Sequence, residues 1–480
     1  MEGQHLNPHF TSGGDRVELP PIPRTGYARM DDLEVSRSGL TARISFDMVD
    51  ADWVDKHLRR ESSRFGADTP PVLDFENMPL FHLEIVVRLY RDRVSKGWRN
   101  HWWETPYAPT DIHRLLSPDS WQDRYFDGRF DPSYDPSAWF FIERMSKRSS
   151  HRANIYRSMS GEFESIYVEI HERFTSKQLD RVFTLPGTAS RTLEPQALAL
   201  LSGVACDRVV VFDVGQGNAN GMVKEGCNGP ELFYDVGAGV YGNHHTRPHG
   251  GPNLPVGNAK AVILSHWDSD HWAGANIPSN NELLSKTWIA PQQTVGPRQV
   301  AFAHRISACK GNLLLLGGMA PRVQAIPLQG GKVLQLTQGA GRDRNDSGLV
   351  AAVETNTPAS LRRSIILTGD CDYCHFSHLA TAPIKGLVVP HHGASLKSDN
   401  SDVPSSRGEP STLAYSFGPN NAHGKSRVRH PTIDGVALHS AWHHGSWLPS
   451  RPGVGNPGPQ VLATSDHTHK APRGDVYLDW

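Results

Sequence analysis

The sequence predicts an α/β fold in which two β-sheets carry helices on their outer sides, preceded by an N-terminal α+β region. Three observations support this fold class. Beyond about residue 200, short runs rich in β-branched residues alternate with Gly and Asn, and few helical segments separate them. Several of these runs stop at a histidine or an aspartate. A chain of 480 residues is also too long for one ordinary core, so two domains are expected.

Residues 1–198 form the expected N-terminal α+β region. Partial alternation of polar and apolar residues over 33–49 predicts a strand pair, while 78–94 and 146–184 have apolar residues at helical spacing. Residues 185–200 are rich in Pro, Gly, Thr and Ala, as is typical of a linker. No chemistry can be assigned to this region, and a protein partner, a substrate contact or an inhibitory role are its open alternatives.

Residues 204–480 form the expected second domain. Its expected helices cover 299–309 and 431–439. Its expected strands are 209–212, 231–234, 261–264, 287–290, 333–337, 349–354, 364–368, 386–389, 412–417, 460–464 and 475–478.

Composition narrows the class of protein. A net charge of -1 gives no global footprint for nucleic acid or an anionic membrane. We expect no membrane span and no secretory signal, because no run approaches the roughly 18 apolar residues of a membrane helix and the first residues are polar. Five cysteines do not indicate a disulfide framework, so a cytoplasmic location is expected.

The central feature is the stretch AVILSHWDSDHWAGA at 261–275. A buried strand is expected to end there and to deliver His266, Asp268, Asp270 and His271 onto one tight turn. Imidazole nitrogens and carboxylate oxygens are ligands of divalent zinc, manganese and iron. A polar loop with a chance excess of His and Asp is the alternative. Four such residues within six positions at a strand end favour a metal site.

Other strands end in the same way. Asp213 and Asp235 each follow a β-branched or aromatic run, and we expect these carboxylates to orient the 266–271 turn from behind. Asp370 follows another strand and His391 a further one. The glycines after Asp213 also resemble a nucleotide-binding loop, but a strand rather than a helix is expected to follow them, which argues against that interpretation.

The order of these motifs resembles the metallo-β-lactamase superfamily, and within it the hydrolase domain of ComEC-type DNA-uptake proteins. The motifs are Asp-Val-Gly-Gln-Gly, Asp-x-Gly, Ser-His-x-Asp-x-Asp-His, Leu-Thr-Gly-Asp and Pro-His-His-Gly. The stretches 344–350, 416–421 and 430–431 support the narrower likeness. The resemblance covers about residues 204–480 and implies a four-layer αββα metallo-β-lactamase sandwich.

The resemblance also implies a ligand set. Asp270, His271 and His391 would hold one ion, His266 and Asp268 would help to hold a second, and Asp370 would bridge them. The sequence departs from the family pattern in having Asp268 where many members have a histidine. A further family histidine, between 271 and 370, has no convincing counterpart, since His304 falls in an expected helix. We therefore expect one or two divalent ions, zinc or manganese.

Hydrolysis is the expected reaction, because a divalent ion lowers the pKa of bound water from 15.7 to near 7. The leading hypothesis is a phosphodiesterase or nuclease acting on nucleic acid or a small phosphodiester. Its candidate catalytic residues are Asp270, His392, His430 and Asn421, the last three for charge stabilisation and protonation of the leaving group. A hydrolase of a small ester, amide or lactam is one alternative, and a catalytically silent binding module is the other.

One further motif has two interpretations. Cys371 and Cys374 form a Cys-x-x-Cys directly after Asp370. Such a pair can be redox-active. Because the surrounding sequence is not thioredoxin-like, an ordinary connection between a strand and a helix is the preferred interpretation.

Overall fold

The computed structural model describes residues 7–11, 18–35, 41–65, 73–92, 99–102, 137–146, 151–171, 173–355, 362–379, 382–405, 411–421, 430–442, 447–448, 451–455, 460–465 and 473–480. The chain divides into two units, each treated below by itself. The first contains Met1–Leu185, Thr294–Arg305 and Ala422–Val428. The second contains Pro186–Gln293, Ile306–Asn421 and Arg429–Trp480.

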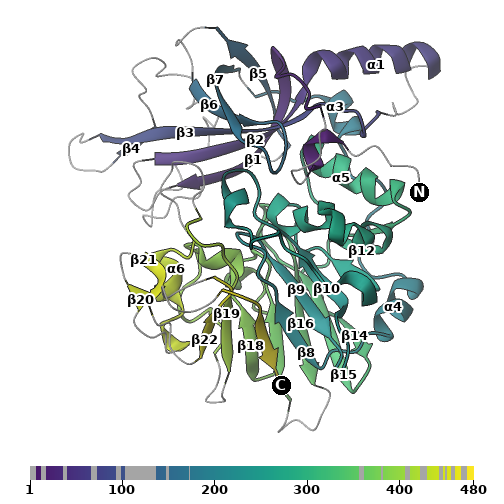
Figure 1. Ribbon diagram of the computed structural model, residues 1–480, viewed down its shortest axis with the longest axis vertical. Coiled ribbons are helices and arrows are strands. Elements are labelled where there is room, and N and C mark those ends of the chain that lie inside the picture. Colours follow the sequence, from purple (N-terminus) through teal and green to yellow (C-terminus); the bar gives the residue numbers. More distant parts are fainter. Residues whose placement is uncertain are drawn as a thin grey trace. The chain divides into compact units, whose positions relative to one another are not determined.

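The first unit is built on a closed barrel of six antiparallel strands (Figure 1). Around the barrel the order is β2 (Thr41–Asp50), β1 (Thr25–Val35), β5 (Trp139–Met145), β7 (Phe163–Ile170), β6 (His151–Tyr156) and β3 (Leu80–Asp92). Pairing of β3 with β2 closes the ring, and β4 (Arg99–Trp102) extends β3. Apolar side chains from all six strands fill the interior. Closure removes the exposed edges that an open sheet would have.

Charged residues on the outward faces of the barrel strands are buried by helix α5 (Pro297–Ala308). Arg298, which is fully buried, donates from Nη2 to Asp31 at 2.7 Å, and its backbone N–H donates to Asp47 at 2.8 Å. His82 Nδ1 lies 3.0 Å from Arg298 Nη1. These contacts fix the start of α5 on the barrel, which explains why a segment so late in the chain belongs to the first unit. The other helices of this unit are η1 (Pro8–Phe10), α1 (Ala51–Phe65) and α3 (Lys177–Val182).

The second unit contains two mixed sheets of seven strands. The first has the order β13 (Asn312–Leu316), β12 (Thr287–Pro291), β11 (Ala261–Ile263), β10 (Pro230–Val236), β9 (Ala219–Val223), β8 (Arg208–Val211) and β23 (Val476–Asp479). The second has the order β14 (Gln324–Leu328), β15 (Lys332–Gln338), β16 (Leu349–Thr355), β17 (Ser364–Leu367), β18 (Ile384–Val388), β19 (Thr412–Tyr415) and β22 (Val461–Ala463). Strands β10 to β13 are parallel, as are β17, β18, β19 and β22. A separate hairpin pairs β20 (Trp447–Leu448) with β21 (Arg451–Gly455).

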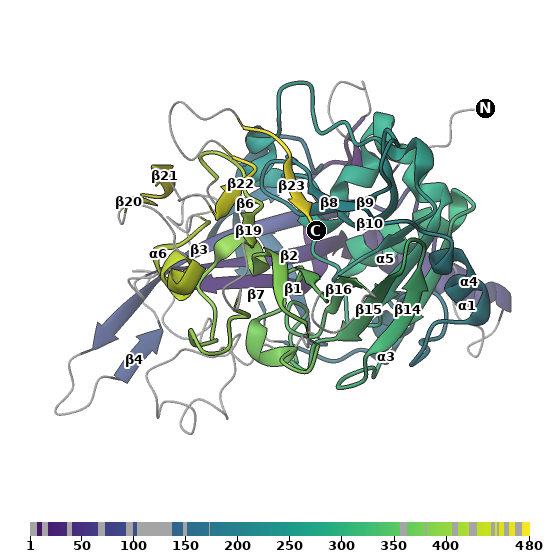
Figure 2. The same cartoon turned by 90° about the horizontal axis from the view of Figure 1, so that it is seen from below.

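The two sheets share one hydrophobic core, and Figure 2 shows them as separate layers. Along β16, Ala351 and Val353 point into this shared core. Their neighbours Val350 and Ala352 point to the opposite face, where they meet a second apolar cluster that includes Trp442. Residues from η8 (Tyr373–His375), α6 (Ile433–Leu438) and η10 (Ser440–Trp442) contribute to that cluster. The second sheet is therefore buried on both faces, as its nearly continuous apolar strands require. The unit also contains α4 (Pro195–Ser202).

All eleven strands expected beyond residue 200 are present, but three N-terminal expectations are wrong. Residues 78–94 hold strand β3 rather than a helix. Residues 146–184 hold β6, β7 and only the short helix α3. Both faces of β3 are buried between Leu80 and Ile85, so the period of two that marks a half-exposed strand is missing. The expected linker also contains helix α4.

No helix in the described part of the chain has both the length and the apolar character needed to cross a membrane.

Candidate metal centre

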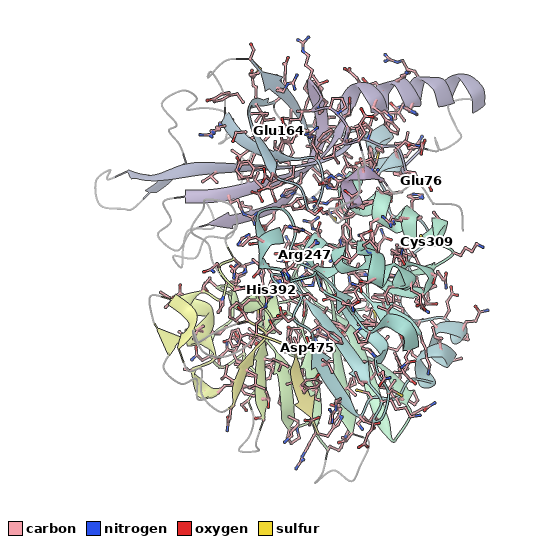
Figure 3. The ribbon with its side chains drawn as sticks, in the orientation of Figure 1. Glu76, Glu164, Arg247, Cys309, His392 and Asp475 are labelled. Carbon is pink, nitrogen blue, oxygen red and sulfur yellow. The ribbon has the colours of Figure 1, made fainter. Side chains whose placement is uncertain are left out.

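The candidate site lies where strands of both sheets of the second unit end. Asp235 is the next-to-last residue of β10, and the 265–271 turn follows β11, its parallel neighbour. Asp370 follows β17, and the turn Pro390–Gly393 follows the parallel strand β18. Parallel strands present their carboxyl ends at one edge of a sheet, so each sheet gathers its own polar residues. The two groups meet where His271 Nε2 lies 3.1 Å from Asp370 Oδ1. Figure 3 shows His392 at this end of the sheets.

Close packing against β10 fixes the turn that carries the histidines. The backbone N–H and the hydroxyl of Ser265 both donate to the carboxylate of Asp235 at 2.7 Å. A Cβ atom at Gly237 would lie 1.7 Å from the carbonyl oxygen of Asp270. Only glycine leaves room for that carbonyl. The Asp-x-Gly motif therefore provides both the carboxylate that the turn binds and the space that it needs.

Two overlapping groups of side chains could each hold a metal ion. The first consists of His266, His271 and Asp370, and the second of Asp270, His271 and His392. Within each group the candidate ligand atoms lie within 4.8 Å of one another. In the second group His392 Nε2 is 3.2 Å from Asp270 Oδ2. Four of the six residues expected from the sequence to bind metal therefore lie in these groups, and the other two, Asp268 and His391, lie beside them.

The buried polar atoms at this place lack hydrogen-bond partners among the described residues. Four of them are Nε2 of His266, His271 and His392, and Oδ1 of Asp370. Leaving one buried polar atom unpaired costs about 1–3 kcal/mol, so four together would be a heavy burden unless something else binds them. Imidazole nitrogens and a carboxylate oxygen are a ligand set for zinc, manganese or iron. The donor set fits a divalent metal ion.

Hydrogen bonds at the far side of each ring orient the lone pairs inward. His271 donates from Nδ1 to Asp235 at 2.8 Å, and His392 donates from Nδ1 to the carbonyl of Ser416 at 2.8 Å. The hydroxyl of Ser265, already donating to Asp235, accepts from Nδ1 of His266 at 3.0 Å. With Nδ1 carrying the proton in each ring, Nε2 is left as the metal-binding atom.

The buried carboxylates and imidazoles of the site shift the pKa values of one another. Burial alone would raise the pKa of Asp370, but the neighbouring His271, His391 and His392 outweigh it and hold that pKa well below its usual range. Burial also acts to lower the pKa of His271, yet the carboxylates of Asp370 and Asp235 raise it well above its usual value. The Asp370 carboxylate is therefore ionised, and a metal ion that binds His271 must displace the proton which these carboxylates hold on its Nε2.

The Pro390–Gly393 turn places its two histidines differently from the expected assignment. His391 was expected to join Asp270 and His271, but His392 takes that place. His391 Nε2 lies 3.7 Å from Asp370 Oδ2, and its side chain is one-quarter exposed. Both residues have left-handed backbones, with φ of 50° and 53°. This conformation is uncommon outside glycine and turns the second ring into the site while the first stays at its rim.

Asp268 lies at the edge of the first group and has a buried cationic partner. Its Oδ2 is 3.4 Å from His266 Nε2, and its Oδ1 is 2.9 Å from Nη2 of Arg344. The Arg344 side chain is only 5% exposed. Asp268, which was expected to bind metal, is thus held in an ion pair with a buried arginine.

The remaining candidate catalytic residues, His430 and Asn421, make different kinds of contact. Gln216 accepts from the backbone N–H of Gly418 with Oε1, so its amide nitrogen faces Nδ1 of His430 at 3.4 Å. The neutral His430 ring therefore carries its proton on Nε2. Among the described residues, the side chain of Asn421 bonds to backbone groups, those of Gly418 and His430. Asn421 thus holds the backbone of Gly418 and His430 in place. It was expected to stabilise charge on a substrate, but its side-chain amide is used in these bonds.

Several other residues singled out in the sequence lie away from the cluster. Asp213 pairs with Arg473 at 2.5 and 2.6 Å and does not touch the 265–271 turn, contrary to expectation. His304 stacks on Phe75 in the first unit, with ring centroids 4.1 Å apart. Cys371 is buried and Cys374 exposed, and neither forms a disulfide. Burial raises the pKa of the Cys371 thiol well above its usual value, so that thiol is unreactive.

Three supporting residues were not identified as functional from the sequence. Ser265 and Gln216 stand inside motifs that were noted, and each orients a histidine. Arg344 begins the stretch that resembles an Asn-Asp-Ser turn, but nothing in its sequence position pairs it with Asp268. Contacts between loops far apart in the chain are needed to find such residues.

The fold and site define an α/β unit with a buried His/Asp cluster at the strand ends. No protein-family model matches the chain, and no curated protein is similar enough to count as a relative. Among solved structures, a match is MEM-A1, a subclass B3 metallo-β-lactamase isolated from a soil metagenome library, at 14% identity and a TM-score of 0.21. The match covers 38% of this chain and 66% of that chain, just under two thirds of its length. At that TM-score the likeness carries no argument.

Proposed function

We propose that this protein is a metal-dependent hydrolase of the metallo-β-lactamase type, acting on a phosphodiester. The observation that carries the proposal is the convergence of three buried imidazole Nε2 atoms and Asp370 Oδ1, none with a hydrogen-bond partner among the described residues. The proposal includes the four-layer αββα arrangement. Its support is the core shared by the two sheets and the apolar cluster on the far face of the second sheet.

His271, His392, Asp270 and Asp370 would hold the ion. A bound divalent ion would supply Lewis-acid chemistry, lowering the pKa of a water to near 7 and polarising the scissile group. Asp235 contributes by fixing His271 in the tautomer that binds metal. The exposed fractions of Asp270 and His391, 22% and 25%, leave the cluster open to solvent on one side, as a reacting site requires.

We assign protonation of the leaving group to His430. Its ring centroid lies 5.2 Å from that of His391 and 6.3 Å from that of His392. The amide of Gln216 donates to its Nδ1, which keeps the proton on Nε2. A general acid must hold its proton on the atom that faces the leaving oxygen. With its proton on Nε2 rather than on the nitrogen bound by Gln216, His430 has a proton available to donate.

Two features favour a phosphodiester over an ester, amide or lactam. The motifs of residues 204–480 resemble those of ComEC-type hydrolase domains, which makes nucleic acid the favoured substrate class. Asp270 and Asp370 would also supply oxygen ligands to the ion beside the two imidazoles. Oxygen ligands suit manganese and magnesium, ions that proteins bind together with substrate phosphates.

The test is a substrate screen with the full chain in manganese, zinc or magnesium. The substrates are single- and double-stranded DNA, bis(p-nitrophenyl) phosphate, a p-nitrophenyl ester and a chromogenic cephalosporin. We expect phosphodiester cleavage that a chelator abolishes and that Asp270→Ala reduces at least 1,000-fold. Asp479→Ala, at a side chain that is 64% exposed, is the control and should keep full activity.

The other outcomes are equally informative. Turnover of the ester or cephalosporin alone would replace the phosphodiester with a small carbonyl substrate. Metal binding without turnover of any substrate would identify a binding module instead. Full activity in Asp270→Ala would reject the site itself.

A further inference from the structure

The two candidate metal groups compete for one ligand atom. Both include His271. Its Nδ1 proton is held by Asp235 at 2.8 Å, so the ring has a single lone pair, on Nε2. One lone pair binds one ion. Two ions can therefore occupy the cluster only if one of them does without His271.

Asp370 of the first group lies close enough to the second group to add a fourth ligand. His271 Nε2 is 3.1 Å from Asp370 Oδ1 and 3.9 Å from Asp270 Oδ1. His392 Nε2 is 3.2 Å from Asp270 Oδ2 and 3.9 Å from Asp370 Oδ1. Ligands of a tetrahedral ion with bonds of 2.0–2.1 Å lie about 3.3 Å from one another. Each of the two imidazole nitrogens thus lies 3.1–3.9 Å from an oxygen of each carboxylate, close to that spacing.

The other position has fewer ligands and an extra positive charge. Without His271 it keeps His266, Asp268 and Asp370. Oδ2 of Asp370 is 3.7 Å from His266 Nε2 and 3.7 Å from Nε2 of the part-exposed His391, which belongs to neither candidate group. The guanidinium of Arg344 lies 2.9 Å from the Asp268 carboxylate and is almost fully buried. Buried charges are weakly screened, so Arg344 repels a second cation at Asp268 while neutralising the carboxylate that would attract it.

We propose that this protein holds one divalent ion, bound by Asp270, His271, His392 and Asp370, and that Arg344 supplies the positive charge at Asp268 in place of a second ion. The inference rests on the proposed function, since it assigns the metal stoichiometry of the same site. It also makes Arg344 a positioning residue that sets how many ions bind.

The test is metal content by mass spectrometry, after the full chain has been loaded with zinc or manganese and freed of unbound ions. The wild type should hold one equivalent, and Arg344→Met should hold close to two because Asp268 is released. Arg342→Met is the matched control, since Arg342 is exposed and only two residues away. It should stay at one equivalent.

Substitutions on the two sides of the cluster give a second measurement if Arg344→Met does not fold. Asp268→Asn and His266→Ala should both keep one equivalent, whereas His392→Ala should hold less than 0.2. Two equivalents in the wild type, or loss of one equivalent in Asp268→Asn, would overturn the inference and leave the metal-dependent function standing. A wild type that binds no ion would overturn both.

Discussion

The carboxylate of Asp235 accepts a hydrogen bond of 2.8 Å from Nδ1 of His271, and both side chains are fully buried. Asp235 also accepts two hydrogen bonds from Ser265. One carboxylate thus holds the turn that carries the histidines and selects the tautomer of one of them. Its backbone has φ of 60°, a conformation that asparagine and aspartate tolerate better than other side chains.

Replacing Asp235 by Asn should weaken metal binding. The amide keeps the shape and the left-handed backbone but removes the charge that strengthens His271 as a ligand. Partners of this kind typically change metal affinity about 10–100-fold. We expect the dissociation constant for zinc, measured by competition with a chelator, to rise at least tenfold. An unchanged constant would show that Asp235 only supports the turn.

The two neighbouring histidines should differ sharply when substituted. His392→Ala removes a ligand that lies 3.2 Å from Asp270, so bound metal and activity should both be lost. His391→Ala removes a ring that lies outside both candidate groups, so most of the bound metal should remain. Metal analysis of the two purified variants decides between them. The reverse result would restore the assignment expected from the sequence.

Gly237→Ala should disrupt the site without touching any ligand. The new methyl group would lie 1.7 Å from the carbonyl oxygen of Asp270, so the turn must move. Overpacking of this kind costs about 3 kcal/mol. We expect a lower thermal midpoint together with weaker metal binding. Gly257→Ala is the control, because a Cβ there meets nothing within 4 Å, and it should match the wild type.

Arg298→Ala should destabilise the first unit strongly. Removing this buried guanidinium leaves Asp31 without its partner at 2.7 Å, and breaking a buried ion pair costs about 3–5 kcal/mol. Arg24→Ala removes an ion pair with Glu143 in which Arg24 is 79% exposed, so it should cost at most about 1 kcal/mol. Urea unfolding, followed by pulse hydrogen exchange on peptides from β1 to β3, measures both. Equal costs would argue against the buried network.

The first unit should lose stability on acidification. Burial lowers the pKa of His82 from its ordinary value and, with Arg298 and His82 nearby, lowers that of His9 further. The folded state therefore binds fewer protons than the unfolded chain as the pH falls below about 6.5. The free energy of unfolding therefore keeps its full value above that pH. Below it, the free energy falls by about 1.4 kcal/mol per pH unit for each of the two histidines.

The pH dependence can be assigned by substitution. In His9→Asn the slope of unfolding free energy between pH 6.5 and 5 should be smaller by one proton than in the wild type. The same pulse hydrogen exchange measurement at each pH gives the slope. An identical slope in the variant would show that His9 is not buried in its neutral form.

The comparison of sequence and structure separates two kinds of information. Strand positions beyond residue 200 could be predicted because buried parallel strands are written as short runs of β-branched residues. The same reasoning failed over 78–94 and 146–184, where polar residues such as His82 and Glu84 are buried on the outside of a barrel. In the sequence a buried polar residue looks the same as an exposed one. The spacing of apolar residues therefore predicted helices where the structure has strands.

The sequence by itself determined the chemistry available to this protein: His and Asp at strand ends, with glycines where the turns are tight. Only the tertiary structure decided which atoms meet. It turned His392 rather than His391 inward, paired Asp268 with Arg344, and used Asn421 to hold a loop. The physical reason is that the place where a strand ends depends on the residues next to it in the sequence. Ring orientation and charge pairing depend instead on loops that approach from distant parts of the chain.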